Sequence, residues 1–453
     1  MKQFYMMILL LAILGASCKP GPRELNKGPV EHPDWSRTAT IYEVNIRQYT
    51  PQGTFVALER ELPRLQKMGI DILWLMPIHP IGDKNRKGSL GSYYSVRDYF
   101  GVNPEYGTMK DFKELVNKAH NLGMKVIIDW VANHTSWDNE MLTDHPDWYK
   151  KDSTGKVIPP VADWTDAAAL DYTQEGLRKY MIKALEFWIR EADIDGYRCD
   201  VAGMLPVDFW NQAIPDLKKI KPVFMLAEEE TPLIHDTGLF DASYSWQLFR
   251  MMNQIAKGTQ SADKIDSLFA AEKKVYNADA YRMRFTSNHD ENSWNGTEFE
   301  RLGDGAQAFA VLTFTCPGMP LIYSGQEAAM NKRLRFFEKD TIPWGNFALE
   351  SFYSRLTSLK KKDSRLFSAG KEGGDFLKVP TSNDRQVYAF LRKNDSGKVF
   401  VLLNLSPEAV TVQLTGNAYS GRYRELFSGI EREWKAGATV ELLPWEYQVY
   451  DNR

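Results

Sequence analysis

The sequence predicts an α/β fold: a (β/α)8 TIM barrel with a short excursion domain after strand three and a C-terminal antiparallel β-sandwich. Eight short apolar segments between residues 40 and 325 alternate with amphipathic helical segments. Several of these segments are almost continuously apolar, as expected for parallel strands that helices cover on both faces. From about residue 364 the pattern changes to alternating apolar and polar residues with turn signals. A doubly wound open sheet shows the same alternation of strands and helices, so it is the alternative fold.

The first three repeats are predicted before residue 132. The segment TIYEVNIRQY (40–49) is the first strand, and the second and third are ILWLMP (72–77) and KVIIDWV (125–131). A helix at 110–123 separates the second strand from the third. Another helix follows the first strand and ends at Gly69, and its apolar face carries Phe55, Leu58, Leu62, Leu65 and Met68.

Five further strands follow a long insertion. The insertion, residues 134–172, is rich in Trp, Asp and Pro and is too long for a standard connection, so it predicts a small domain over the barrel mouth. A helix at 175–192 leads into the fourth strand. The remaining strands are predicted at 195–202, 223–228, 239–245, 282–288 and 320–325.

The barrel domain is predicted at residues 35–360 and a separate antiparallel sandwich at 361–453. The second unit contains the alternating segment QVYAFLRKNDSGKVFVLLNLS, whose NDSG sequence is a hairpin turn signal. The segments AVTVQL and VELLPWEYQVYD have the same alternation.

The N-terminus is predicted to be a secretion signal. Residues 1–18 contain an early Lys, an apolar run too short to span a bilayer, and small residues before Cys18. The sequence LGASC resembles a bacterial lipoprotein cleavage box, which would make Cys18 the lipidated first residue, and ordinary signal cleavage is the alternative. Residues 19–34 then form a linker. We expect an exported protein in the periplasm or on the outer membrane, bound to the membrane only through this lipid anchor.

Composition excludes several classes of partner and site. The net charge of -3 gives no basic excess that would attract nucleic acid. Besides Cys18, only Cys199 and Cys316 are present, which is too few for a disulfide framework and gives no zinc spacing. The 13 Trp, 21 Tyr and 23 Phe residues are a weak indication of a carbohydrate ligand, because flat rings stack on sugar faces.

Polar residues gather where the predicted strands end. In parallel barrels the catalytic groups project from the C-terminal ends of the strands. Acidic and basic residues follow the third, fourth, fifth and seventh strands, so we expect them to meet on one rim. They are Asp129, Asn133, His134, Arg198, Asp200, Glu228, Glu229, Glu230, His289, Asp290, Glu291 and Asn292.

Arg198 and Asp200 lie on one face of the fourth strand, because side chains alternate with a period of two. The guanidinium is expected to keep the carboxylate ionised, and Cys199 points the other way into packing. An ionised carboxylate facing a protonated one, about 5 Å away, can break a glycosidic bond with retention. For this pair alone, a structural ion pair is the alternative interpretation.

Four segments together resemble a known family. DWVANHTS, DGYRCDVA, LAEEE and FTSNHDEN occur in this order, on strands three, four, five and seven, and resemble the signature regions of the alpha-amylase superfamily, glycoside hydrolase family thirteen. GSYYSVRDYFGVNPEYGT is similar to the family's stretch after strand two, and PGMPLIYSGQE to its strand eight. The C-terminal sandwich matches the family's usual third domain.

The resemblance implies a role for each matched residue. Asp200 is the implied nucleophile, Glu228 the general acid/base, and Asp290 a third carboxylate that binds sugar hydroxyls. The implied sugar-binding and supporting residues are Tyr94, which stacks beneath the sugar, His134 and His289, which hydrogen-bond it, Arg198, which orients Asp200, and Asp129, which supports Arg198.

Two assignments stay open at this stage. Glu228 is chosen as the acid because the family's glutamate follows a small residue, here Ala227, and Glu230 would require strand five to run two residues further. No cofactor is required. Asn133 matches a calcium ligand of many family members, although the insertion shows no clear cluster of further oxygen ligands.

The resemblance implies a retaining hydrolase that acts by double displacement on alpha-linked, mainly alpha-1,4, glucans such as starch, maltodextrin or maltooligosaccharides. Alternatives within the family are an alpha-glucosidase, an alpha-1,6-acting enzyme or a glucan transferase. A non-catalytic starch-binding relative is a remote alternative, because such proteins usually lose a carboxylate and all three are present here. The sequence indicates no oligomeric state.

Overall fold

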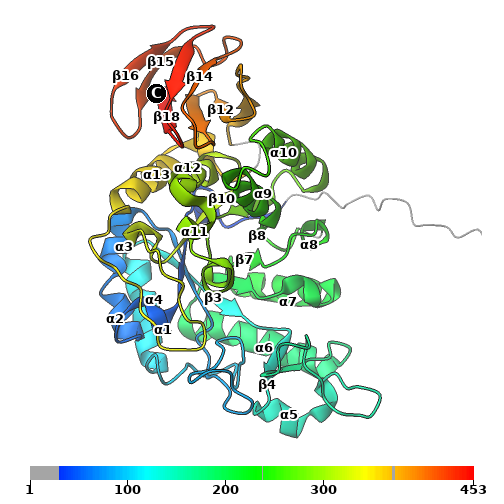
Figure 1. Ribbon diagram of the computed structural model, residues 1–453. Coiled ribbons are helices and arrows are strands. Elements are labelled where there is room, and N and C mark those ends of the chain that lie inside the picture. The colour runs from blue at the N-terminus through cyan, green and yellow to red at the C-terminus, as the bar shows by residue number, and fades with distance from the viewer. Residues whose placement is uncertain (1–29, 237, 370–372, 453) are drawn as a thin grey trace, which may run out of the picture.

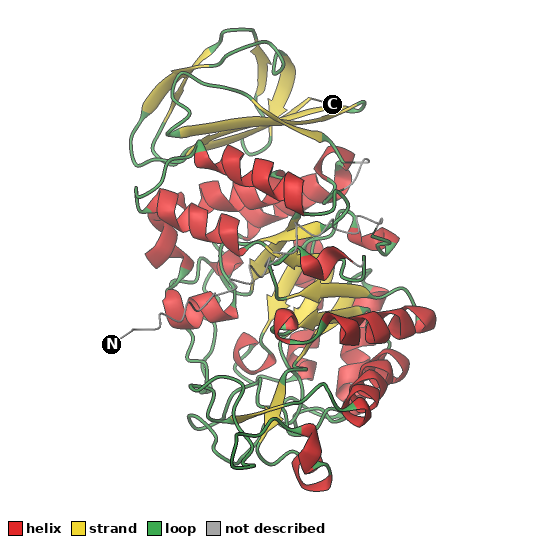
Figure 2. Cartoon of the chain, turned by 90° about the vertical axis from the view of Figure 1, so that its right-hand side faces the viewer, coloured by secondary structure: helices red, strands yellow, loops and turns green. Residues whose placement is uncertain are grey.

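The computed structural model describes residues 30–236, 238–369 and 373–452. Eight parallel strands form a closed barrel in the order β1-β10-β9-β8-β7-β6-β3-β2, with helices around it (Figures 1 and 2). The predicted barrel is therefore confirmed, and the open-sheet alternative is wrong. The strands are β1 (Ile41–Val44), β2 (Ile72–Leu75), β3 (Lys125–Trp130), β6 (Gly196–Cys199), β7 (Phe224–Ala227), β8 (Ala242–Tyr244), β9 (Tyr281–Arg284) and β10 (Met319–Tyr323).

Each predicted strand segment overlaps one barrel strand, and the strands are shorter than the segments. β9 and β10 each begin one residue before the predicted segment. The largest difference is in the first segment, where β1 ends at Val44 and a helical turn, α1 (Ile46–Tyr49), follows. The N–H groups of Gln48 and Tyr49 donate to the carbonyl of Asn45 at 3.1 and 2.9 Å, which closes this turn. Apolar character alone does not distinguish a strand from a buried helical turn.

The helices around the barrel start and end at local signals. The first predicted helix is divided into α2 (Phe55–Glu59) and α3 (Leu62–Met68), because Pro63 has no N–H to continue the ladder of hydrogen bonds. Gly69 ends α3 in the left-handed conformation at φ 94°. The larger helices that follow are α4 (Met109–Asn121), α6 (Glu175–Ala192), α7 (Val207–Ile220), α9 (Trp246–Ala256), α10 (Lys264–Val275), α12 (Ala306–Thr315) and α13 (Glu350–Lys362). The short ones are α5 (Glu140–Asp144), α8 (Leu233–Asp236) and α11 (Glu298–Leu302).

Strand alternation divides the barrel side chains into two sets. On β6, Tyr197 and Cys199 belong to the apolar core between the strands and the helices. Arg198, between them, is fully buried on the opposite, inward face. Cys199 is therefore a packing residue, as expected, and Asp200 continues the inward face at the end of the strand.

The insertion after β3 forms a small lobe below the barrel in Figure 1. Its ends are joined, because β4 (His134–Ser136) pairs antiparallel with β5 (Ala167–Ala169). Between them lie α5 and loops (Figure 2). This pairing places His134 at the base of the lobe, where it meets the barrel.

The C-terminal unit is antiparallel, as predicted. One sheet has the order β11-β12-β13-β18-β15-β16, and β14 and β17 form a second pair across a shared apolar core. The hairpin turn was predicted correctly, since Asn394 and Gly397 are paired across it. The strands are β11 (Asp375–Lys378), β12 (Val387–Asn394), β13 (Gly397–Asn404), β14 (Val410–Gln413), β15 (Gly421–Glu425), β16 (Glu431–Trp434), β17 (Thr439–Leu442) and β18 (Tyr447–Asn452).

Two buried basic side chains join this unit to the barrel. Lys360, near the end of α13, donates to the carbonyls of Gly318, at 2.8 Å, and Leu366. Arg392 on β12 donates to three carbonyls, those of Thr315, Phe367 and Gly374. Burial lowers the pKa of Arg392 to about 10. The helix α13 ends at Lys362, two residues beyond the predicted end of the barrel domain at residue 360.

The start of the described chain lies against the barrel. Val30 is buried, and the ring of His32 stacks on Tyr281 and contacts Asp241 at 2.8 Å. Val30, His32 and Pro33 of the predicted linker are therefore packed, whereas Glu31 and Asp34 are exposed. The predicted signal, Cys18 and the rest of the linker lie outside the described residues. In the described ranges no helix combines the length and the apolarity needed to cross a membrane.

Candidate active site

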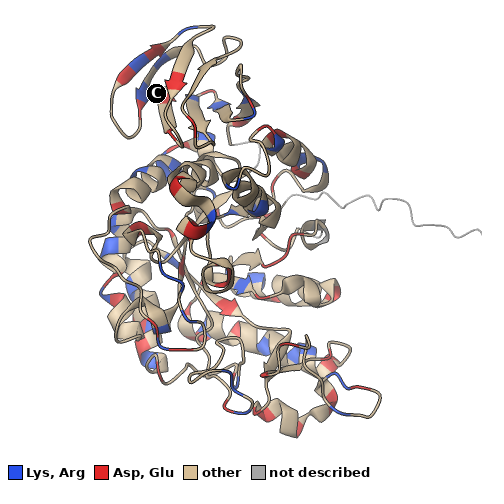
Figure 3. Ribbon diagram, in the orientation of Figure 1, with Lys and Arg blue, Asp and Glu red and all other residues tan. Residues whose placement is uncertain are grey.

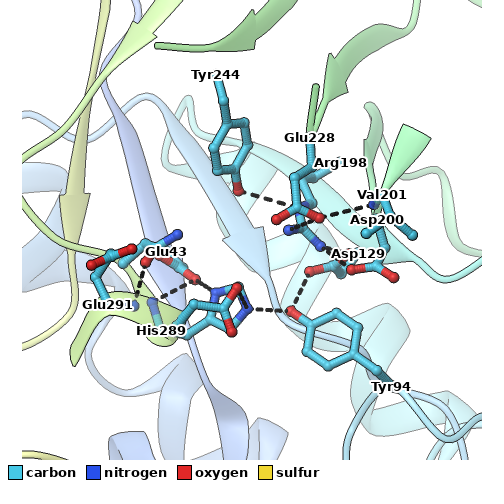
Figure 4. Close-up of polar contacts among 12 residues, drawn as sticks. Glu43, Tyr94, Asp129, Arg198, Asp200, Val201, Glu228, Tyr244, His289 and Glu291 are labelled. Carbon is cyan, nitrogen blue, oxygen red and sulfur yellow. Dashed lines mark hydrogen bonds and ion pairs between the residues drawn. The ribbon is translucent and has the colours of Figure 1, made fainter. Parts of the chain in front are cut away.

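A pocket of about 620 Å³ opens at the C-terminal ends of the barrel strands, beside the insertion. Six of the predicted site residues line it: Tyr94, His134, Asp200, Glu228, His289 and Asp290. Asp129 and Arg198 lie fully buried behind this layer and contact it (Figure 4). Asn133 is buried beside His134 and is not part of the pocket wall.

Arg198 is shared by three carboxylates. Its Nη1 lies 2.8 Å from Asp129 Oδ1 and 3.0 Å from Asp200 Oδ1. Its Nη2 lies 2.9 Å from Glu228 Oε2, in an ion pair without hydrogen-bond geometry. The Nε donates to the hydroxyl of Tyr244 at 3.2 Å. One guanidinium therefore offsets the charges of three acidic groups in a buried cluster.

The surroundings of Asp200 and Glu228 favour the protonated form of each carboxyl group. Burial raises the pKa of Asp200 well above its ordinary value, and the charges of Glu228, Asp129 and Asp290 add to this effect against Arg198. Burial also raises the pKa of Glu228, with a further contribution from Asp290. The expectation that Arg198 keeps Asp200 ionised was therefore incomplete, because Arg198 is divided among three acids.

Hydrogen bonds indicate where the negative charge resides. Asp129 Oδ2 accepts hydrogen bonds from Trp74 Nε1 at 3.3 Å and from the Tyr94 hydroxyl at 3.0 Å, in addition to the contact of Oδ1 with Arg198. Burial raises the pKa of Asp129, whereas Arg198, His289 and the Tyr94 hydroxyl lower it, so these partners favour the ionised carboxylate against the effect of burial. Burial also raises the pKa values of Asp200 and Glu228, and the two carboxyl groups titrate as a coupled pair.

The backbone at Val201 points toward Glu228. Val201 has a left-handed conformation, φ 39°, which is uncommon for a β-branched residue. Its N–H donates to Glu228 Oε2 at 2.8 Å. Because Oε2 accepts this hydrogen bond and also faces Arg198, a proton on Glu228 is favoured on Oε1. Backbone strain of this kind is often found at functional sites.

The structure places Glu228, and not Glu230, in the pocket. Glu230 Oε1 accepts the N–H of Gln247 at 2.7 Å, and its Oε2 pairs with Arg250 at 3.0 Å. Glu229 Oε1 accepts the N–H groups of the two residues that follow it. Since β7 ends at Ala227, only Glu228 extends the inward face of the strand into the cavity.

Strand register brings Asp200 and Glu228 together. Cys199 on β6 is paired with Ala227 on β7, and the N–H of Glu228 donates to the Cys199 carbonyl at 3.0 Å. Asp200 and Glu228 each follow a residue of this pair. Neighbouring strands lie about 5 Å apart, so the two carboxyl groups start from adjacent positions on the same rim.

His289 connects the third carboxylate to the barrel interior. Its Nδ1 lies 2.5 Å from Glu43 Oε1, and its Nε2 lies 2.8 Å from the Tyr94 hydroxyl and 3.4 Å from Asp290 Oδ2 (Figure 4). Burial lowers the pKa of His289, but Asp290 and Glu43 outweigh burial and raise it to about 9. The ring is therefore cationic at neutral pH.

The Glu43–His289 pair predicts a pH-dependent stability. The pKa of His289 is raised in the folded state, so protonated His289 stabilises the fold. This stabilisation is fully present below the unfolded pKa of about 6.5 and is lost as the pH rises through about 9. In Glu43→Gln we expect this loss to be complete at least about one pH unit lower and to be smaller in total, because the nearer carboxylate is gone. Denaturant titrations from about pH 6 to about pH 10 measure the effect. His289→Asn is the control that removes the titration, and an unchanged pH profile in Glu43→Gln would contradict the assignment.

His134 has the opposite electrostatic character. Burial lowers its pKa to about 4, so the ring is neutral at ordinary pH. It lies 5.3 Å from the ring of Trp164, which comes from the insertion. A neutral imidazole at the pocket wall can donate or accept one hydrogen bond with a sugar hydroxyl.

The donor set around Asn133 gives no support to a calcium site. The side-chain amide nitrogen of Asn133 lies 3.3 Å from His134 Nδ1. The main-chain carbonyl of Asn133 accepts the N–H of Leu170. Among the described residues, no group of three or more His, Cys, Asp and Glu side chains could hold a metal ion. Calcium binding at Asn133 stays a prediction.

Several pocket residues were not identified from the sequence. Glu43, which is buried and contacts His289 without lining the pocket, was detectable, because it is a charged residue within the apolar run TIYEV. Val201 acts through its backbone, and the aromatic residues come from loops without a periodic pattern. The pocket residues missed are Lys87, Ser92, Ser95, Asp163, Trp164, Asp166, Ala167, Val201, Trp294, Phe336 and Phe337.

Comparisons with known families agree with this arrangement. The family profile "Alpha amylase, catalytic domain" matches residues 39–237, which include Asp200 and Glu228. The profile "Maltogenic Amylase, C-terminal domain" matches residues 376–449. These matches fall on the barrel and on the C-terminal sheet unit respectively.

Individual relatives are similar over most of the chain. An alpha-amylase of Haloarcula japonica is 28% identical over 87% of this chain, and alpha-amylase 2 of Dictyoglomus thermophilum is 26% identical over 88%. The chain spans 60% and 74% of the lengths of these two relatives.

Solved structures extend the likeness to three dimensions. A maltogenic alpha-amylase from Thermotoga neapolitana has a TM-score of 0.83 and 29% identity, with 91% of this chain and 98% of that chain covered. An alpha-amylase from Lactobacillus plantarum has a TM-score of 0.82 and 30% identity, with 92% and 99% covered. With its closed barrel, its C-terminal sheet unit and this agreement along nearly its whole length, the chain belongs to the alpha-amylase family of glycoside hydrolases.

Proposed function

We propose that this chain is a retaining hydrolase of alpha-1,4-linked glucans that acts on starch, maltodextrin or maltooligosaccharides. The observation that carries the proposal is the placement of Asp200 and Glu228 on adjacent strand ends, around one guanidinium, in one pocket. A coupled pair that holds one proton supplies the two groups that double displacement requires.

In the first step an ionised Asp200 attacks the anomeric carbon, and the bond to the leaving oxygen breaks. Glu228 gives its proton to that oxygen, which becomes a hydroxyl group. In the second step Glu228 takes a proton from water while the water oxygen attacks the anomeric carbon, and the ester to Asp200 breaks. Glu228 ends protonated and Asp200 ionised, so the charges and protons balance.

The surrounding residues support the reacting ring. Asp290 and the cationic His289 line the pocket beside Asp200, where they can bind sugar hydroxyls. Tyr94 lies with its ring toward the pocket and its hydroxyl between Asp129 and His289. Arg198 favours the ionised form of both carboxyl groups. When the proton is on Glu228 Oε1, the negative charge is therefore stabilised on Asp200.

Retention is tested by the configuration of the first product. We expect proton NMR of maltoheptaose hydrolysis to show the alpha anomer of the new reducing end before mutarotation, because two inversions occur at one carbon. Prompt appearance of the beta anomer would indicate a water-mediated inverting reaction and would overturn the proposal. Asp208→Asn, at an exposed position on α7, is a control that should leave the result unchanged.

Transfer to a sugar acceptor is the second candidate. Relatives named cyclomaltodextrinase (Thermoanaerobacter pseudethanolicus, 26% identity) and alpha-1,4-glucan:maltose-1-phosphate maltosyltransferase (Mycobacterium tuberculosis, 31% over 237 residues) share the family. An acceptor sugar in place of water would use the same two carboxylates. Products longer than the substrate, detected by mass spectrometry, would favour transfer, and an alpha-glucosidase or alpha-1,6 preference would appear as glucose release or pullulan cleavage.

We also propose export with a lipid anchor at Cys18, in the periplasm or on the outer membrane. The support is the sequence of residues 1–18 alone. Metabolic labelling of the expressed protein with a fatty acid tests it, with Cys18→Ser as the variant that should lose the label.

A further inference from the structure

The pocket has an aromatic wall that begins at Tyr94 and continues beyond the residues that the proposed chemistry uses. Three half-buried or exposed rings follow one another outward from the reaction centre. Tyr94 and Phe336 lie nearly parallel, 6.2 Å apart with 17° between planes, and Phe336 lies 5.3 Å from Trp294 at 39°. Trp294 is 52% exposed and lines the pocket at the end of this row.

Each ring in the row is fixed by the fold. Trp294 is part of a π-helical turn, Glu291–Asn295, that begins directly after Asp290. Such turns are rare and are frequently found at functional sites. The turn that places the third carboxylate therefore also presents Trp294.

The segment that carries Phe336 is held against the loop after β2. The N–H of Leu90 donates to the Phe337 carbonyl at 3.1 Å, and the N–H of Ser89 donates to Glu338 at 3.0 Å. Buried Arg47 donates to the carbonyls of Leu90 and Gly91. The wall is thus built before a ligand binds, which reduces the entropic cost of binding.

The strand order determines which side of the reaction this wall serves. Tyr94 follows β2, Trp294 follows β9 and Phe336 follows β10, and these strands lie together with β1 on one side of the barrel. The adjacent strands β6 and β7, which deliver Asp200 and Glu228, lie on the opposite side. The leaving group departs toward Glu228, so the wall faces the part of the glucan that stays on the nucleophile.

We propose that Trp294, with Phe336, forms a platform for glucose units of the donor part of an alpha-glucan, beyond the unit that is cleaved. This inference rests on the proposed function. The apolar face of a pyranose ring suits a flat, half-exposed indole, and a lone exposed Trp on a rigid turn gives such a surface. A glucan with several donor units gains this contact, and a short one does not reach it.

Substrate length tests the platform. We expect Trp294→Ala to lower kcat/KM for maltoheptaose on the order of tenfold, with little change for maltotriose, and Trp294→Phe to recover much of the loss. Ile430→Ala, which removes an exposed apolar side chain from the C-terminal unit, is the matched control. An equal loss on both substrates, or no loss on maltoheptaose, would overturn the proposal.

The cleaved bond tests the direction. With maltoheptaose labelled at its reducing end, loss of a donor contact should move cleavage toward the non-reducing end and lengthen the labelled fragments. Shorter labelled fragments would place Trp294 on the acceptor side and refute the assignment.

The affinity for maltoheptaose, measured in a variant that does not hydrolyse it, tests this inference independently of the proposed function. Calorimetry of maltoheptaose with Asp200→Asn, compared with Asp200→Asn/Trp294→Ala, should show weaker binding in the double variant on the order of tenfold. If the wild-type protein does not hydrolyse maltoheptaose but the two variants still differ in affinity, the platform is supported and the proposed function is rejected. Equal affinity in the two variants, or no binding in either, would reject the platform.

Discussion

Replacing Asp200 with Asn is expected to abolish hydrolysis of maltoheptaose, with kcat lowered by at least about 10⁴-fold. The amide has the shape of the carboxylate but cannot form the ester with the anomeric carbon. The substitution also removes one negative charge from a cluster in which three carboxylates share Arg198. The free energy of unfolding should therefore stay equal or increase, since crowding among like charges is relieved.

Two measurements distinguish lost chemistry from lost structure. Single-turnover kinetics with maltoheptaose give the rate, and denaturant unfolding gives the stability. Asp208→Asn, which removes a surface ion pair with Arg178, should keep the wild-type rate. A slow but persistent turnover in Asp200→Asn, within about tenfold of the wild type, would exclude Asp200 as the nucleophile.

Replacing Glu228 with Gln is expected to lower kcat on maltoheptaose by about 10²- to 10⁴-fold, because the leaving sugar is no longer protonated. The loss should be much smaller for formation of the glycosyl-enzyme from maltosyl fluoride, since fluoride leaves without a proton. Azide should then restore turnover, because an anionic nucleophile needs no general base.

The neighbouring glutamate gives a matched comparison. Glu230→Gln removes a carboxylate two residues away, which pairs with Arg250 and Arg282 outside the pocket. We expect Glu230→Gln to change the rates with maltoheptaose and with maltosyl fluoride to the same extent. Azide should not increase the turnover of this variant. If the substrate dependence and the rescue appeared in Glu230→Gln instead, the acid would be assigned to the wrong residue.

The sequence predicted the barrel and most of the acidic rim for a physical reason. Parallel strands buried on both faces must be apolar, so polar residues at their ends are visible as interruptions. Asp129, Asp200 and Asp290 were found in this way. The choice of Glu228 over Glu230 depended on where β7 ends, which the sequence indicated only through Ala227.

Features that depend on distant contacts were not predictable. The sharing of Arg198 among three acids depends on which strands are neighbours, since Asp129 lies on β3 and Glu228 follows β7, and these two strands flank β6. The aromatic wall depends on loops, where no periodicity applies. Strands β11, β15 and β16 were missed because they are short and their outward residues are mostly charged or polar.

The surface charge follows the composition. Lys and Arg are interspersed with Asp and Glu along the helices around the barrel (Figure 3). The groups with strongly altered pKa values in the pocket therefore owe these shifts to burial and near neighbours, and a change of ionic strength should affect them little.

Lys360 and Arg392 have a consequence for any attempt to shorten the protein. Both are buried basic side chains whose hydrogen bonds go to main-chain oxygens on the barrel side and in the segment that leads to the sheet unit. A truncated enzyme ending near residue 361 would leave Lys360 without its Leu366 acceptor and would expose the apolar surfaces of α12 and α13. Nicking the connecting segment would, for the same reason, leave two fragments that remain associated, so the barrel and the sheet unit must be exchanged together when chimaeras of this enzyme are made.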